Sequence, residues 1–122
     1  MASTQFHEAA ETLRAETREM HRALASLIEE LEAVDWYAQR IDATHDPELA
    51  QILSHNRDEE KEHACMVLEW IRRRDPKFDE HLRKLLFSSG PIVDSGRDVA
   101  ANGAGTGASL RIGSLRTQGE AT

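Results

Sequence analysis

Residues 49–70 read LAQILSHNRDEEKEHACMVLEW, and this stretch decides the fold. Alternating steps of four and three place one residue per turn on a single helix face: Leu49, Leu53, Asn56, Glu60, His63, Val67 and Trp70. That spacing is typical of a seam between packed helices. The seam is apolar at both ends and polar in its middle. Its polar residues need a reason, because a buried ionised carboxylate is costly unless it is paired or binds a metal.

The residues around this seam predict two long helices and one short helix. A similar apolar spacing predicts a first helix from about His7 to about Asp42. Asp46–Pro47 suits the start of a second helix, which should end near Arg74. Asp75–Pro76 then interrupts the chain. A short third helix is expected from four apolar residues that share one side: Phe78, Leu82, Leu85 and Leu86. The short connection between the long helices predicts an antiparallel hairpin.

The distribution of glycine divides the chain. All seven glycines lie at or beyond Gly90. We therefore expect an all-α helical domain over residues 1–89, a flexible Gly-rich linker over residues 90–108 and a disordered tail over residues 109–122.

Composition and charge exclude several classes of protein. The chain has 122 residues, a net charge of −7 and few aromatic residues, which fits one small domain of helices with charged outer faces. An acidic chain is a poor nucleic-acid binder and a better cation binder. No apolar run is long enough to span a bilayer, and residues 1–7 lack the pattern of a signal peptide. Cys65 is the only cysteine and is expected to be buried. These features predict a cytoplasmic protein.

The polar middle of the seam predicts half of a metal site. Glu60 and His63 are three residues apart, so they project from one helix face. Glu30 lies in an otherwise apolar stripe of the first helix, and these oxygen and nitrogen donors suit iron, manganese or zinc. A ferritin-like di-iron site takes one Glu from each of two helices and Glu-x-x-His from each of two others. Two chains related by a two-fold axis would complete it. Asp42 and His45 have similar spacing but fall at a predicted turn.

Further acidic residues surround these three. They are Glu29 and Glu32 beside Glu30, and Glu59 and Glu62 beside Glu60. His55, Glu59 and Glu62 share one helix face and form a candidate secondary metal site. The alternative is a solvated surface, or an acidic approach that concentrates cations near the centre. Tyr37 lies on the Glu30 stripe and is a candidate for contact with the metal site.

Two stretches resemble the encapsulated ferritins, which are cargo proteins of encapsulin compartments: EELEAVDWY at 29–37 and HNRDEEKEH at 55–63. The match covers nearly all of residues 8–90. It implies a two-helix protomer with a short third helix, which dimerises into a ferritin-like four-helix bundle. It also implies a ring of dimers, expected to be a decamer.

The resemblance also implies residue roles. Glu30, Glu60 and His63 become the iron ligands of a di-iron ferroxidase centre formed between two protomers, which other divalent cations could also occupy. Glu29 and Glu32 match carboxylates that lead metal ions inward, and Tyr37 matches a tyrosine beside the centre.

The tail resembles an encapsulin-targeting peptide. Residues 109–116 read SLRIGSLR, with three apolar side chains on a flexible tether that could dock into a groove of the shell protein. The resemblance therefore implies a location in the encapsulin lumen. Residues 117–122 extend past this motif and have no assigned role.

The function expected from the sequence is oxidation of Fe²⁺ to Fe³⁺ with O₂, feeding mineral storage inside an encapsulin shell. Two alternatives stay open at this point. One is a non-catalytic helical adaptor in which the polar seam residues set the register. The other is a di-metal enzyme that consumes peroxide.

Overall fold

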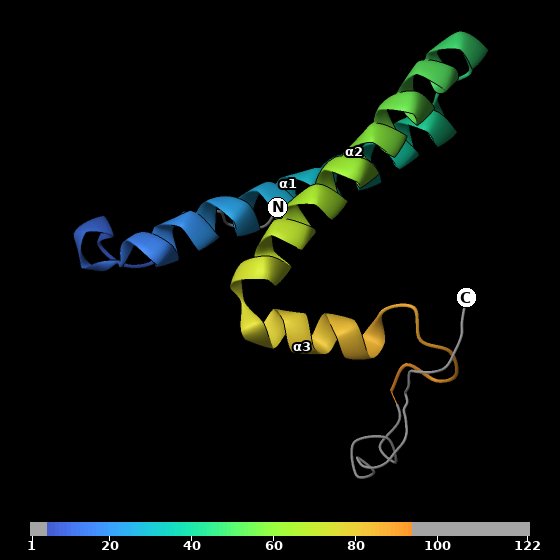
Figure 1. Ribbon diagram of the computed structural model, residues 1–122. Helices are drawn as coiled ribbons and strands as arrows, with labels where there is room; N and C mark the ends of the chain where they lie inside the picture. The colour runs from blue at the N-terminus through green and yellow to red at the C-terminus, as the bar shows by residue number, and fades with distance from the viewer. Residues whose placement is uncertain (1–4, 94–122) are drawn as a thin grey trace. The chain divides into compact units, whose positions relative to one another are not determined.

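The computed structural model describes residues 5–93, and this part of the chain contains helices and no strand. In chain order they are a 3₁₀ turn η1 (Ala10–Thr12), α1 (Ala15–Ala43), α2 (Pro47–Arg74) and α3 (Pro76–Leu85) (Figure 1). The chain divides after Arg74 into two compact units. The all-α class and the pair of long helices followed by a short one are confirmed. None of the described helices is long and apolar enough to cross a membrane.

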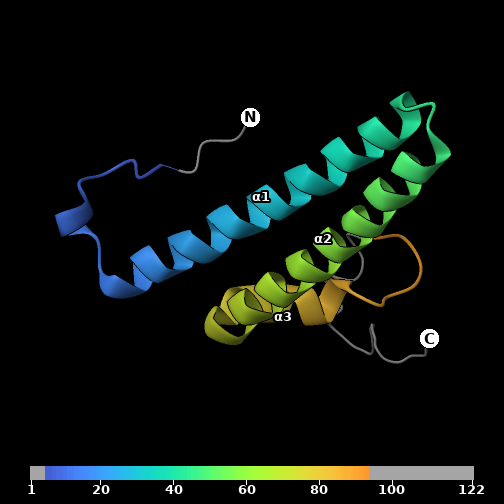
Figure 2. The same ribbon diagram turned by 90° about the horizontal axis from the view of Figure 1, so that it is seen from above.

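Helices α1 and α2 form an antiparallel hairpin. They lie side by side next to their connection and diverge toward the start of α1 (Figures 1 and 2). The connection is short because Asp46 begins α2 directly. Its Oδ1 accepts hydrogen bonds from the backbone N–H groups of Glu48, at 3.0 Å, and Leu49, at 3.4 Å. The predicted start of the second helix is therefore confirmed, and its physical cause is the expected cap.

The first helix begins later than predicted, at Ala15 rather than near His7. The backbone of Leu13 and Arg14 is extended, and residues 10–12 form only a single 3₁₀ turn. The Arg18 side chain explains the difference. Its Nη1 donates to the Leu13 carbonyl at 2.6 Å and to the Ala10 carbonyl at 3.2 Å, which gives these oxygens partners outside a helix.

The segment before α1 also packs against α1 itself. The rings of Phe6 and His21 lie with their centroids 4.6 Å apart. His21 therefore has a packing role.

The core of the hairpin is very small. Of the described residues only Ala64, 7% exposed, and Ile71, 0% exposed, are buried apolar side chains. Both belong to α2 and are one heptad apart, on a line that runs beside the predicted seam. Leu49, a predicted seam residue, is exposed. Cys65 was expected to be buried and is exposed, because it follows Ala64 and points off that line.

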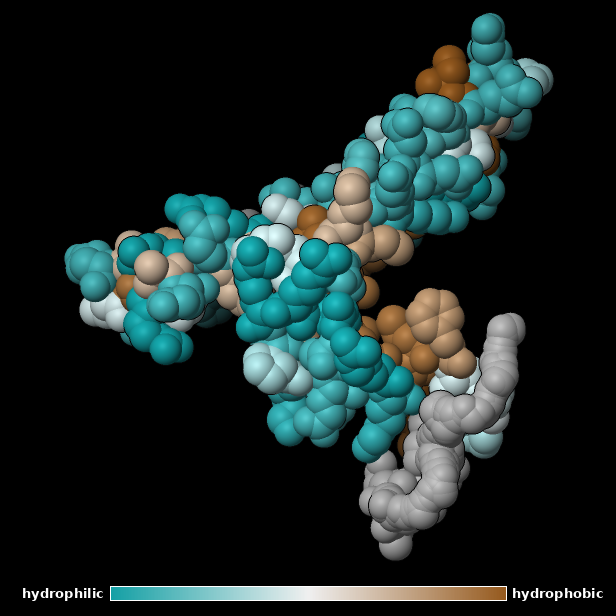
Figure 3. Space-filling view, viewed as in Figure 1, coloured by the Kyte–Doolittle hydropathy of each residue, from teal (hydrophilic) through white to brown (hydrophobic). Residues whose placement is uncertain are grey.

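The hairpin leaves large apolar side chains on its surface. Leu31, Ile52 and Met66 are each more than half exposed. Apolar side chains reach the visible surface in Figure 3 as well. Two helices can cover only a narrow strip of each other, so this amount of exposed apolar surface points to a further covering partner.

The end of α2 carries a network of ion pairs. The Glu69 carboxylate accepts hydrogen bonds from Arg72 at 2.8 Å and from Arg73 at 2.7 Å. These bonds lower the pKa of Glu69 to about 2. The Arg74 guanidinium lies 4.0 Å from the centre of the Trp70 ring. Positive side chains at the C-terminus of a helix also interact favourably with its dipole.

The second unit contains α3, which begins at a strong cap. Asp75 Oδ1 accepts from the backbone N–H groups of Lys77, at 2.9 Å, and Phe78, at 3.0 Å, and Pro76 occupies the first helical position. The helix ends at Leu85. Shortly afterwards Phe87 adopts a φ of 61° and is 98% exposed. A bulky residue rarely adopts this left-handed conformation.

The cap of α3 gives a stability prediction. A helix of 10 residues is marginal on its own, so it depends on its cap. We expect Asp75→Ala to destabilise α3 by about 1 kcal/mol, because two backbone N–H groups lose their acceptor. NMR amide exchange at Lys77 and Phe78 measures the effect. Asp75→Asn keeps an accepting oxygen and serves as the control. Equal protection in Asp75→Ala and the wild type would contradict the prediction.

Candidate metal centre

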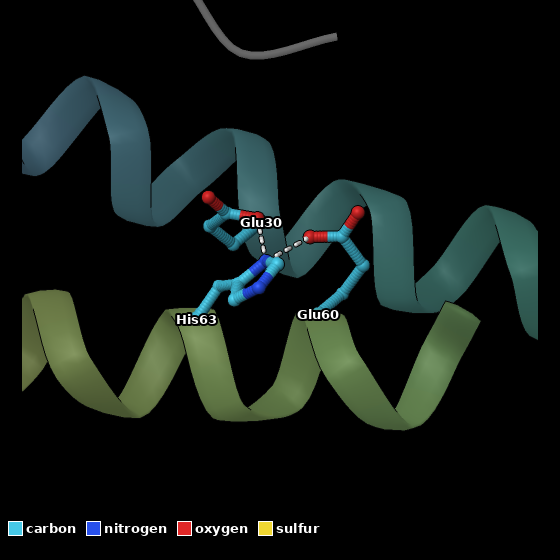
Figure 4. Close-up of side chains that lie close together, drawn as sticks. All are labelled: Glu30, Glu60 and His63. Atoms are coloured by element: carbon cyan, nitrogen blue, oxygen red, sulfur yellow. Dashed lines mark hydrogen bonds and ion pairs between the residues drawn. The ribbon is translucent and has the colours of Figure 1, made fainter. Parts of the chain in front are cut away.

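Three side chains from two helices converge in the middle of the hairpin. Glu30 comes from α1, and Glu60 and His63 come from α2 (Figure 4). One ligand atom of each lies within 4.8 Å of the others. The His63 Nδ1 atom is 3.2 Å from Glu60 Oε1 and 3.8 Å from Glu30 Oε1. Among residues 5–93 no other group of three His, Cys, Asp or Glu side chains is this close.

The sequence places these side chains together for simple reasons. Residues three apart on a helix share a face, so Glu60 and His63 project side by side. The short connection after α1 turns the chain back on itself and brings Glu30 opposite them. The three predicted ligands are therefore brought together by the hairpin itself.

The two carboxylates influence each other's pKa. The Glu30 and Glu60 side chains are 27% and 24% exposed, so neither is fully solvated. A hydrogen bond between them raises the pKa of Glu30 and lowers the pKa of Glu60. Burial and the negative charge of Glu60 raise the pKa of Glu30 further. The two acids therefore have pKa values that are shifted in opposite directions, as expected for two carboxylates in one site.

His63 completes the cluster as a donor. Its ring N–H donates to Glu60, and this bond raises the pKa of His63. A cation could take the place of these interactions between the three side chains. Carboxylate oxygens and imidazole nitrogen form a donor set that fits iron, manganese or zinc. One chain supplies two carboxylates and one imidazole, which is half of a ferritin-like di-metal set.

The other predicted residues lie outside this cluster. Glu29 is exposed, and its charge contributes to the raised pKa of Glu30. Glu32 is half-buried on the same helix. The ring of Tyr37 has the Arg40 guanidinium 5.6 Å from its centre. Their proposed roles stay predictions.

The candidate secondary site is only partly assembled. His55 Nε2 lies 3.2 Å from Glu59 Oε2, and both side chains are more than half exposed. Glu62 is also exposed, and it does not join them in a close group of three within residues 5–93. A secondary metal site at these residues stays a prediction.

One side chain near the centre, Arg57, was not predicted from the sequence. The Nε atom of Arg57 is buried and has no hydrogen-bond partner within residues 5–93. Arg57 is one turn before Glu60, and it lies one heptad before Ala64 on the line that continues to Ile71. The heptad spacing of Arg57, Ala64 and Ile71 was the signal available in the sequence.

Comparison with known proteins shows the relatives of this chain. A sequence model of the EncFtn-like family matches residues 5–89. An encapsulated ferritin-like protein of Rhodospirillum rubrum is 54% identical, over 94% of this chain and 90% of its own length. The encapsulin nanocompartment cargo protein EncC of Myxococcus xanthus is 35% identical, over 80% of this chain and 85% of its own length.

A solved structure shows the same likeness. The crystal structure of protein NE0167 from Nitrosomonas europaea is 60% identical and superposes with a TM-score of 0.71. The alignment covers 73% of this chain and 98% of that one. Because the family match spans the whole hairpin and α3, the chain belongs to the EncFtn-like family of encapsulated ferritins.

Proposed function

We propose that this protein is a ferroxidase, which oxidises Fe²⁺ to Fe³⁺ with O₂ at a di-iron site formed between two copies of the chain. The observation that carries the proposal is the convergence of Glu30, Glu60 and His63 from two helices. In this reaction the Fe²⁺ ions are substrate, and each gives up one electron. O₂ is the electron acceptor, and Fe³⁺ leaves as mineral.

The protonation of the cluster suits cation binding. Carboxylates bind metal in their deprotonated form, so Fe²⁺ would favour the charged forms of Glu30 and Glu60, which would hold and bridge the ions. His63 loses its N–H bond to Glu60 and offers its nitrogen instead. The acidic residues next to the cluster attract cations toward it. Glu29 and Glu32 are proposed to lead ions inward, and Tyr37 is proposed to lie beside the assembled centre.

A second copy of the chain supplies the missing half. Each chain has one Glu30 and one Glu60–His63 pair, whereas a ferritin-like centre uses twice that number. The exposed apolar side chains Leu31, Ile52 and Met66 lie on the two helices that carry the ligands. A two-fold axis would bury such a face against itself and would bring the two half-sites together. A ring of such dimers, five for a decamer, is part of the proposal.

Storage requires a compartment outside the protein. A two-helix protomer encloses no space of ferritin size, so the mineral must collect elsewhere. A relative from Myxococcus xanthus is named as encapsulin cargo. We place the present protein in the lumen of an encapsulin shell, held there by residues 109–116. This segment and most of the linker over residues 90–108 lie outside the described residues.

The ligand assignment gives the first functional prediction. Glu60→Ala or His63→Ala should lower the rate of Fe²⁺ oxidation by more than about 100-fold, because even changes behind the ligands cost about 10–100-fold. Helix content should not fall, because the mutation removes a half-buried polar group. Absorbance of the ferric product and circular dichroism measure the two quantities.

The matched control for this experiment is Glu59→Ala, which removes an exposed carboxylate beside Glu60. Full activity in both ligand variants would exclude this centre and leave a non-catalytic adaptor as the better reading. Loss of peroxide without ferric product would instead favour a peroxide-consuming enzyme.

The two-copy site predicts that metal promotes association. An ion that binds only the assembled centre stabilises the assembly by mass action, by about 2.7 kcal/mol when free metal is 100 times its Kd. Light scattering of metal-free and Fe²⁺-loaded protein without O₂ should therefore show a larger mass in the loaded sample. His63→Ala should abolish the shift. A monomer that binds two iron ions would refute a site shared between copies.

The tail prediction separates activity from location. Deletion of residues 109–122 should leave iron oxidation unchanged, because the tail contains no ligand cluster. It should prevent loading into the shell, because the deletion removes the three apolar side chains that would dock into the shell groove. It also removes the avidity that many tails on one oligomer would provide. Co-expression with the shell protein, followed by measurement of cargo in purified shells, tests this. Equal loading of the truncated protein would show that residues 109–116 are not the targeting signal.

A further inference from the structure

We propose that a hollow between α1 and α2 receives Tyr37 of a second copy of the chain, whose ring fills the space that the small side chain of Ala23 leaves open. This inference rests on the proposed two-copy centre and deepens it. It names the contact that sets the alignment of the two copies, which the three ligands alone leave open.

The hollow lies in the half of the hairpin where α1 and α2 diverge (Figures 1 and 2). It has a volume of about 370 Å³, and its lining includes Ala23 and Ser26 of α1 and Met66, Val67 and Trp70 of α2. Protein pockets that hold small ligands begin at about 300 Å³, so one aromatic side chain fits this space.

The shape of the hairpin indicates the direction of the two-fold axis. The hairpin is narrow at its connection and wide at its other end (Figure 2). An axis across the helices packs the narrow end of each copy against the wide end of the other, and neighbouring helices are then antiparallel, as in up-and-down bundles. An axis along the helices would put the two wide ends together and leave both hollows open. The shape therefore favours the axis across the helices.

The sequence of α1 then specifies which residues meet. The centre is level with Glu30 on this helix. Ala23 precedes Glu30 by seven residues and Tyr37 follows it by seven, so each lies about 10.5 Å from Glu30 on one stripe. An axis across the helices at Glu30 places Tyr37 of one copy opposite Ala23 of the other. Helical side chains lean toward the N-terminus of their helix, so the Tyr37 ring leans from this level toward the level of Ser26.

The same axis pairs two large apolar residues on α2. Trp70 follows His63 by seven residues, and Leu53 precedes Glu60 by seven. Because the axis lies between Glu60 and His63, Leu53 of one copy lies opposite Trp70 of the other, which lines the hollow. Tyr37 and Leu53 both belong to the narrow end of the hairpin. The narrow end of one copy thus supplies the bulk that the wide end of the other lacks.

A single copy leaves this contact incomplete on both sides. Tyr37 and Trp70 are only half-buried, and Met66 is 57% exposed. Assembly would bury all three, as expected for large side chains in the middle of an interface. A tyrosine suits the role, because it offers a large contact area and loses little conformational entropy when it is fixed.

The test changes the size of each side of the contact and measures association by analytical ultracentrifugation, without metal and with Fe²⁺ in the absence of O₂. Tyr37→Ala should weaken association by at least about 30-fold, the usual effect of truncating an aromatic anchor. Ala23→Leu should also weaken it, because the added side chain occupies the hollow, while the high helix propensity of Leu preserves α1. Tyr37→Phe keeps the ring and is the matched control, which should associate nearly as tightly as the wild type.

A double variant separates this contact from general destabilisation. In Ala23→Leu/Tyr37→Ala the added and removed volumes compensate, so association should recover most of the loss seen in either single variant. Two independent destabilising changes would instead add their effects. Additive losses in the double variant would overturn the proposal, and so would wild-type association of Ala23→Leu alone.

Failure of this inference can be distinguished from failure of the proposed function. If the wild type associates and oxidises iron while Ala23→Leu associates equally tightly, only this inference fails. If the double variant recovers association while the wild type oxidises no iron, the contact stands and the ferroxidase proposal fails. If the wild type stays monomeric both with and without Fe²⁺, the contact and the shared centre both fail.

Discussion

The whole structure depends on two carboxylates that face each other across the α1–α2 hairpin. Glu30 and Glu60 are both half-buried, and two negative charges in such a place repel strongly. The raised pKa of Glu30 and the contact of His63 with Glu60 both act against this repulsion. A bound cation would act against it as well. The side chains that offset the charge repulsion in the metal-free hairpin are therefore the same ones that would bind a cation.

Much of this arrangement could be predicted from the sequence, because its causes are local. Asp46–Pro47 and Asp75–Pro76 set helix starts through caps that depend on only three residues each. The Glu60–His63 spacing follows from helix geometry alone. The late start of α1 could not be predicted, because it depends on where the Arg18 side chain finds carbonyl oxygens. Arg57 was missed for the same reason, since the burial of one side-chain nitrogen depends on the opposite helix.

The sequence also left open which face of α2 is buried. The predicted seam and the line through Ala64 and Ile71 have the same heptad spacing, so periodicity cannot distinguish them. Burial distinguishes them. Ala64 and Ile71 are buried, whereas the predicted seam residues are partly buried or, at Leu49, exposed. The exposure of Cys65 follows directly from this choice. His63 keeps 44% of its side chain exposed, which fits the proposal that a second copy completes the site.

The division of the ligands has a consequence for inheritance. In the proposed two-copy centre, one codon specifies two positions of the same metal site, so a substitution at Glu60 alters both halves at once. In a cell that expresses two alleles, random pairing would give mixed dimers with one intact half and one altered half. A defective allele would then impair centres that also contain a normal chain. A ferritin whose centre lies within one chain would lose activity only in the chains that carry the change.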